Sequence, residues 1–250
     1  METPAYVSIV FILTTFTTVG FFLRGVKSAG LHTFPAKILL FLLPLWILFQ
    51  SVLATGGFYQ KTEFLPPRLL IFGVVPALAL IAIFLLFFRS SFIEHLPIRL
   101  LTLVHVVRFP VEIVLYWLYH EQLVPREMTF LGWNYDILSG PFAILVFVTV
   151  FRNLPNPETS VSSSLHARVP DSAAKTFVLI AFNLVGIALL INIVTIAVLS
   201  LPSPLQRLAF DQPNRAILSF PYVFLPTVVV PIVLFSHLAV LYKTLRRNPK

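Results

Sequence analysis

Seven long apolar runs account for most of this sequence, and they constrain the fold more than any other feature. A helix needs about 20 apolar residues to cross the hydrocarbon core of a bilayer, and each run approaches that length. The predicted helices are Ala5–Leu23, Ile38–Phe58, Leu69–Phe88, Leu100–Tyr119, Asp136–Phe151, Thr176–Leu199 and Pro221–Tyr242. We therefore expect an all-α integral membrane protein, built as one transmembrane bundle of seven helices over residues 1–250.

The composition supports a membrane setting. Hydrophobic residues make up 58% of the chain and charged residues only 11%, and the mean hydropathy is +0.91, whereas about a quarter of the residues of a soluble domain are charged. The predicted helices leave room only for short connections, so the expected partners are membrane lipids. The chain has no cysteine, which excludes disulfides, thiolate nucleophiles and cysteine-bound metals.

The net charge of +8 and the pI near 10 would also suit a nucleic-acid-binding protein. The lysines and arginines, however, are scattered over the ends of the predicted helices. That distribution is typical of topology signals and not of a basic binding patch. We therefore predict no nucleic-acid partner, and the sequence gives no indication of an oligomeric state.

The basic residues also predict an orientation. With the N-terminus outside, the cytoplasmic connections and tail carry 12 lysines and arginines and the outer loops carry 5, while Arg108 lies inside a helix. Cytoplasmic loops normally hold this excess, so we expect the C-terminus in the cytoplasm and the protein in the cell (inner or plasma) membrane. Residues 152–175, which are rich in proline and serine, are predicted to form a mobile cytoplasmic loop.

The fourth predicted helix concentrates polar residues. His105, Arg108, Glu112 and Tyr116 recur every three or four residues, so they project from one face of the helix. A charged residue at the centre of a membrane helix costs about 2.5–3.5 kcal/mol on insertion scales. We therefore expect this face to line the bundle interior or a water-filled cavity.

Arg108 and Glu112 lie one helical turn apart, so we expect them to form an ion pair. Pro110 between them removes a backbone hydrogen bond near residue 106 and is expected to bend the helix. The pair admits two interpretations. It fastens the helix to its neighbours, or it is functional, with Glu112 as a proton acceptor or general acid/base and Arg108 as a clamp for an anion.

Two histidines are expected to meet in the bundle. His237 lies near the inner end of the seventh helix and His105 on the inner half of the fourth, so both are predicted to share one vestibule. The candidate ligand-binding residues are therefore Arg108, Glu112, Tyr116, His105 and His237. Two imidazoles are able to ligate a haem or a metal, but the sequence lacks the close histidine spacing of such sites, so no cofactor and no metal are predicted.

Polar residues outside the fourth helix suggest structural roles. Asn183 and Asn192 lie on opposite sides of the sixth helix, so each is expected to bond a different neighbour. Asp136 opens the fifth helix, where we expect a capping or first-turn carboxylate at the outer surface.

Three prolines mark the seventh helix as irregular. Pro221, Pro226 and Pro231 follow one another at five-residue intervals, and each lacks the N–H that a regular helix uses. The helix is therefore expected to be bent or partly unwound, as helices that line a cavity often are.

These features leave three functions open. The chain binds or translocates a small solute, a proton or a lipid headgroup, or it is an enzyme on a lipid or isoprenoid-like substrate, or it is a non-catalytic assembly subunit. An enzyme would use Glu112 as acid/base with His105 assisting. It would also need a second acidic group facing Glu112, and the sequence shows none inside another helix. Binding is therefore preferred, and enzymatic activity stays undecided.

Overall fold

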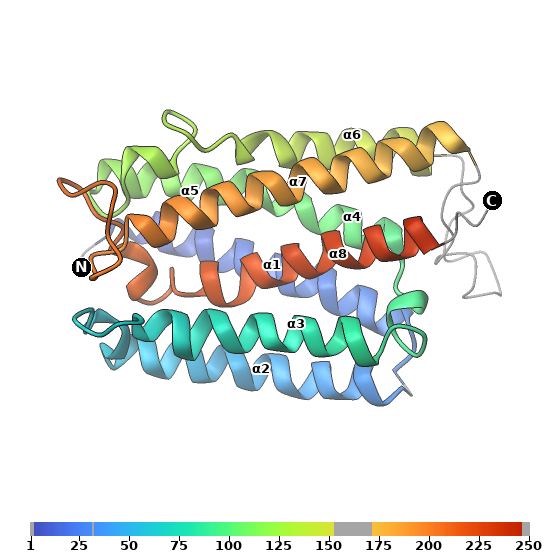
Figure 1. Cartoon of the computed structure of the whole chain (residues 1–250), viewed down its shortest axis with the longest axis horizontal. Helices are drawn as coiled ribbons and strands as arrows, with labels where there is room; N and C mark the ends of the chain where they lie inside the picture. The colour runs from blue at the N-terminus through green and yellow to red at the C-terminus, as the bar shows by residue number, and fades with distance from the viewer. Residues whose placement is uncertain (1–2, 32, 153–171, 247–250) are drawn as a thin grey trace.

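The computed structural model describes residues 3–31, 33–152 and 172–246. Over these ranges the chain forms seven helices that run along the long axis of the molecule (Figure 1). The predicted all-α architecture is confirmed. The loop predicted for residues 152–175 lies almost entirely outside the described residues.

The seven helices are built from eight α-helical segments and several tighter or wider turns. The α-helices are α1 (Ala5–Ser28), α2 (Phe34–Thr55), α3 (Val75–Phe87), α4 (Ile98–Val104), α5 (Arg108–His120), α6 (Ser139–Phe151), α7 (Ala173–Leu199) and α8 (Val230–Arg246). The 3₁₀ turn η4 (His105–Val107) joins α4 and α5 into one helix. The π-helical turns η2 (Leu70–Val74) and η9 (Leu225–Val229) precede α3 and α8, and the 3₁₀ turn η6 (Asp136–Leu138) precedes α6.

Five of these helices are long and apolar enough to cross a membrane, so the chain is a multi-pass membrane protein. They are α1, α2, η2 with α3, α7, and η9 with α8. The helix Asp136–Phe151 is shorter. At 1.5 Å per residue its 16 residues reach about 24 Å, less than the roughly 30 Å thickness of the hydrocarbon core.

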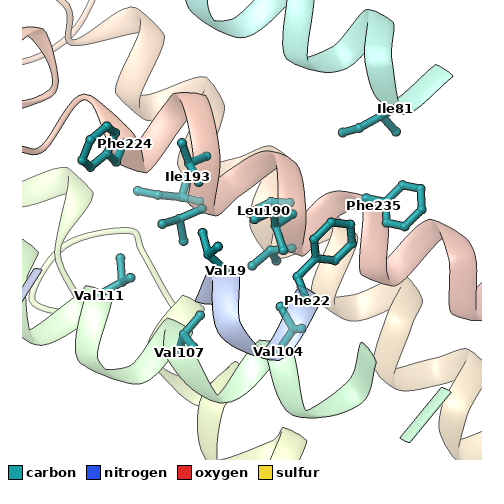
Figure 2. Packing of buried hydrophobic residues seen from close by; sticks show 14 of the residues in the cluster. Val19, Phe22, Ile81, Val104, Val107, Val111, Leu190, Ile193, Phe224 and Phe235 are labelled. Atoms are coloured by element: carbon teal, nitrogen blue, oxygen red, sulfur yellow. The ribbon is translucent and has the colours of Figure 1, made fainter. Parts of the chain in front are cut away.

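The core forms around α1 and α8, between the α2–α3 edge and the α6–α7 edge (Figure 1). In this core Val19 and Phe22 of α1 lie beside Val104 and Val107 of the fourth helix (Figure 2). Phe22 also packs edge to face on Phe235 of α8, with 5.6 Å between ring centroids. The fourth helix is thereby enclosed by other helices, which cover its polar residues.

The fourth helix is interrupted at the place where the sequence predicts a bend. Pro110 lacks the N–H that would bond the carbonyl of Val106, and the chain forms the turn η4 directly before it. Helix α6 packs closely here, because a Cβ at Gly140 would lie 3.2 Å from the Val106 oxygen and 2.7 Å from the Phe109 Cβ. Only glycine lets α6 approach the interrupted turn this closely.

Prolines explain two further irregular turns, and side chains of α2 compensate for both. Pro231 leaves the Thr227 carbonyl without its helical donor, and the indole Nε1 of Trp46 donates to that oxygen at 2.9 Å. In the same way Pro76 frees the Phe72 carbonyl, which accepts a hydrogen bond from the side-chain Nε2 of Gln50 at 2.9 Å. The irregularity predicted for the seventh helix is confirmed, whereas η2 was not predicted.

The connection between α2 and α3 is held by a buried tyrosine. The Tyr59 hydroxyl donates to Gln50 Oε1 at 2.6 Å, so both ends of the Gln50 amide are bonded. Burial raises the pKa of the Tyr59 hydroxyl to about 12, although the hydrogen bond to Gln50 opposes this shift.

Candidate functional site

Arg108 begins α5 and is almost completely buried in the bundle. Its guanidinium binds both carboxylate oxygens of Asp136: Nε donates to Oδ2 at 2.7 Å, and Nη2 donates to Oδ1. Nη2 also donates to the Gly186 carbonyl at 3.2 Å, and the Ser139 hydroxyl donates to Asp136 at 3.2 Å. This bidentate pair joins α5 to the start of the fifth predicted helix and lies against α7.

The predicted ion pair between Arg108 and Glu112 is wrong, because the carboxylate that Arg108 binds is that of Asp136. Asp136 was expected at the outer surface, yet it is 5% exposed. Asp136 begins the turn η6, which packs against α5 and α7, so these helices cover its side chain. Two N–H groups of Arg108 bind its carboxylate there in a planar fork.

Glu112 binds a neutral partner. The side-chain nitrogen of Asn134 donates to both Glu112 oxygens at 2.7 Å and to the Met128 carbonyl at 2.9 Å. The Asn134 oxygen accepts from the backbone N–H of Asp136 at 3.1 Å, so Asn134 connects the two acidic residues. Among the described residues, no lysine or arginine forms a salt bridge with Glu112.

His237 extends the network into α8. Arg108 Nη1 and His237 Nε2 lie 3.1 Å apart, and His237 Nδ1 lies 2.8 Å from Asn183 Oδ1. Arginine has only donors, so Nε2 accepts and Nδ1 carries the proton that bonds Asn183. The Asn183 amide nitrogen donates to the Leu179 carbonyl at 2.7 Å, which orients Asn183 for this contact. A Cβ at Gly186 would overlap the His237 ring, so α7 needs glycine there.

The two predicted histidines do come together. The His105 ring stacks on that of His237 with 3.7 Å between centroids and an interplanar angle of 18°. Both His237 nitrogens already have partners, and stacked rings cannot direct their in-plane lone pairs at one ion. His105 is fully buried, and neither of its nitrogens has a hydrogen-bond partner among the described residues. The geometry therefore argues against a haem or metal shared by this pair.

A cavity of about 90 Å³ borders the acidic part of the network. It lies between α5, α7, η2 and the start of the seventh helix. Its charged lining residues are Arg108, Glu112 and Asp136, and the other 18 lining residues are apolar. The cavity thus has one polar wall, and its other walls are apolar.

The structure divides the predicted ligand-binding residues into two groups. Arg108 and Glu112 line the cavity. His237 reaches it only through Arg108, and His105 only through His237. Tyr116 does not line the cavity, and its ring stacks on Phe130 with 5.1 Å between centroids.

Sequence reasoning missed three partners in this site. Asn134 and Gly186 gave no signal, because neither stands out in its segment. The sequence predicts Asp136 at the outer surface, because nothing in its own segment indicates that α5 and α7 cover it. The expectation that Asn183 and Asn192 bond different neighbours is confirmed, since Asn192 donates to the Trp133 carbonyl at 2.9 Å.

Comparison with known proteins gives a family without a described activity. No curated protein and no solved structure matches the chain. The family model described as a domain of unknown function, DUF8737, matches residues 65–245. This range is well over half of the chain, and it contains α3 to α7, nearly all of α8 and every residue of the buried network. The chain therefore belongs to the DUF8737 family.

Proposed function

We propose that this membrane protein binds the polar end of a small amphiphile in the cavity beside Glu112. The observation that carries the proposal is the lining of that cavity, which is apolar except for Arg108, Glu112 and Asp136. Binding sites for small molecules are usually concave and mostly apolar, with a few polar groups that fix orientation. Ionisable residues inside a membrane bundle are expected to be functional by default.

Charge balance on the cavity wall favours an amine as the polar end. Arg108 and Asp136 neutralise each other, and four of the five N–H groups of Arg108 are engaged. The anion clamp expected of Arg108 therefore has little left to offer. Glu112 has only the neutral Asn134 as partner, and a lone buried carboxylate is unfavourable. A cationic or hydrogen-donating group on the ligand would compensate the Glu112 carboxylate.

The cavity volume limits what fits inside. About 90 Å³ corresponds to the share of roughly three water molecules in the liquid. The cavity therefore takes the polar end and the first carbons of a ligand. The half-buried residues Leu70 and Val74 of η2 and Val194 and Val198 of α7 border the cavity, so we infer that the ligand's chain leaves between these segments into the bilayer.

The test is a comparison of three probes that differ only in their polar end. Dodecylamine, dodecanol and dodecanoate are titrated into the purified protein in detergent, and the melting temperature is measured. We expect a saturable rise with dodecylamine, a smaller one with dodecanol and none with dodecanoate. Glu112→Gln should abolish the rise, while Glu121→Gln, which makes the same change at an exposed position, should retain it. An equal response to dodecanoate, or an unchanged response in Glu112→Gln, overturns the proposal.

An enzyme acting on a lipid or isoprenoid-like substrate is the second candidate. The specific observation in its favour is Asp136, which supplies the second carboxyl group on the same wall as Glu112. Asp136 already accepts hydrogen bonds from Arg108, which leaves the proton-donating role to Glu112. Reconstituted protein that changes the mass spectrum of added membrane lipids, with the change lost in Glu112→Gln, would favour catalysis over binding.

We also infer a topology of seven membrane-crossing helices, with the N-terminus outside and the C-terminus in the cytoplasm of a cell whose inner or plasma membrane holds the protein. The support is the excess of basic residues, 12 against 5, on the predicted cytoplasmic side. Helix α1 begins and α8 ends at opposite ends of the bundle (Figure 1), which agrees with an odd number of crossings.

A further inference from the structure

A second cavity lies away from the buried network, among α1, α2, α3 and α8. Its volume is about 240 Å³, larger than the engineered cavity of about 150 Å³ that stays dry and binds benzene. Its lining is apolar apart from Thr227, whose hydroxyl is bonded to its own helix. Phe22, Ile81 and Phe235 reach it from three different helices (Figure 2).

The cavity extends toward a cluster of cations at one end of the bundle. We call this cluster the basic end, and it consists of Arg24, Lys27, Lys37 and Arg89. The lining residues nearest this end are Phe22, Leu39 and Phe84, and each lies within five residues of one of these cations along the chain.

The cations of the basic end are free to bind an anion. All four side chains belong to exposed residues. Within the described part of the chain, none of them forms a salt bridge with a carboxylate. Arg89 donates from Nε to the Leu85 carbonyl at 2.5 Å, and its guanidinium lies 6.0 Å from the centroid of the Tyr242 ring. Neither contact uses the remaining N–H groups of the guanidinium.

We propose that this cavity holds part of one acyl chain of an anionic phospholipid whose phosphate binds the basic end. The apolar lining excludes water and favours hydrocarbon, and the surrounding bilayer supplies acyl chains. Clustered lysines and arginines beside a membrane helix attract anionic headgroups, with roughly 1 kcal/mol for each charge near the surface. The site is independent of the amphiphile site at Glu112, because the two cavities share no lining residue.

Trp46 lines this cavity and serves as its reporter. Trp117 and Trp133 are the other two tryptophans of the chain, and changing both to phenylalanine leaves Trp46 as the sole indole. This variant is reconstituted into phosphatidylcholine vesicles that contain a small fraction of lipid with brominated acyl chains, which quench indole fluorescence on contact. We expect brominated phosphatidylglycerol to quench Trp46 saturably at low mole fraction. Brominated phosphatidylcholine should quench only in proportion to its amount.

Matched substitutions separate the two parts of the site. Ala77→Phe fills the cavity, whereas Ala82→Phe makes the same change on the exposed face of α3. We expect saturable quenching to disappear in Ala77→Phe and to persist in Ala82→Phe. Replacing Arg24 and Lys37 together by glutamine should raise the mole fraction needed for half-quenching several-fold.

Native mass spectrometry of the wild-type protein keeps the proposal testable if the single-tryptophan variant does not fold. One retained phosphatidylglycerol per chain, lost from Ala77→Phe but not from Ala82→Phe, supports the site. Equal quenching by both brominated lipids at equal mole fraction overturns it. So does saturable quenching that Ala77→Phe leaves intact, and quenching unaffected by the loss of Arg24 and Lys37 contradicts the phosphate contact.

Discussion

Arg108 shows how a membrane bundle keeps a charge at depth. Its partners come from three separate segments, with Asp136 before α6, the Gly186 carbonyl on α7 and His237 on α8. In a medium of low dielectric constant an unpaired charge is far more costly than in water. Arg108 therefore fixes the relative positions of four helices. Removing one of its partners should weaken the packing of all four.

The first prediction concerns coupling between Arg108 and Asp136. Arg108→Met and Asp136→Asn should each destabilise the protein by about 3–5 kcal/mol, because each leaves a buried charge without its partner. The double variant should recover much of this loss. Thermal unfolding of the four proteins in detergent measures the cycle. The same cycle with Glu112→Gln in place of Asp136→Asn is the control and should show weaker coupling, and additive losses for Arg108 and Asp136 would contradict the pair.

The second prediction concerns the contact between α7 and the His237 ring. Gly186→Ala should destabilise the protein by about 1–3 kcal/mol, because the added methyl group would overlap His237. Gly20→Ala is the matched control, since a Cβ at Gly20 meets nothing within 4 Å and alanine is the better helix former by up to about 1 kcal/mol. Melting temperatures of the two variants decide the matter. Equal melting temperatures would show that α7 shifts to accommodate the methyl group.

The polar stripe of the fourth helix could be predicted from its spacing, but its bonds could not. Periodicity identifies which residues share a face, so it places His105, Arg108 and Glu112 in the interior. The partners come from a segment more than 20 residues away, and the spacing of one helix contains no information about that segment. Reasoning from local sequence therefore chose Glu112, the nearest carboxylate to Arg108, and missed Asp136.

At the scale of helices, α2 supplies hydrogen-bond donors to two neighbouring helices whose backbone hydrogen bonding is interrupted by a proline. Trp46 and Gln50 lie one turn apart on α2 and bond the carbonyls that Pro231 and Pro76 leave without a helical N–H. A buried carbonyl without a donor costs about 1–3 kcal/mol, so these two side chains make the π-helical turns tolerable. The prolines of the seventh helix predicted its irregular turn. Pro76 is the corresponding sign for η2, and the sequence analysis did not use it.

The third prediction is a pH dependence at Tyr59, which holds Gln50 in place. The pKa of Tyr59 is about 12 in the folded chain and about 10 when unfolded, so folding favours the neutral hydroxyl. Its contribution is complete below pH 10 and is lost as the pH rises through 12. Tyr59→Phe should lose about 1 kcal/mol at neutral pH, and the gap to wild type should narrow in alkali.

Urea unfolding from pH 8 to 11.5 measures this gap. Tyr135→Phe, which removes a hydroxyl from an exposed tyrosine, is the control and should follow the wild-type profile. A constant difference between Tyr59→Phe and wild type at every pH would contradict the assigned coupling.

At the scale of the whole molecule, hydropathy predicted the number of helices but not the length and burial of each one. Length and apolar composition identify the five long helices. The fourth helix carries buried charges and is enclosed by α1, α6 and α8, and the helix Asp136–Phe151 is shorter than the five long helices. Both departures concern the same site, because the fourth helix supplies Arg108 and the first residue of the short helix supplies its partner Asp136.

The last prediction is the orientation of the bundle. Helix α2 and helix α8 end at opposite ends of the bundle (Figure 1), and the basic excess predicts the C-terminus in the cytoplasm. Green fluorescent protein fused after residue 250 should fluoresce in a bacterial host, and alkaline phosphatase should be inactive there. Inserted at Lys61, alkaline phosphatase should be active.

Neutralising Lys243 and Arg246 should increase the fraction of protein with the inverted orientation, because these charges favour a cytoplasmic tail. Active phosphatase at the C-terminus together with inactive phosphatase at Lys61 would invert the topology, and activity at both positions would contradict the alternation of the helices.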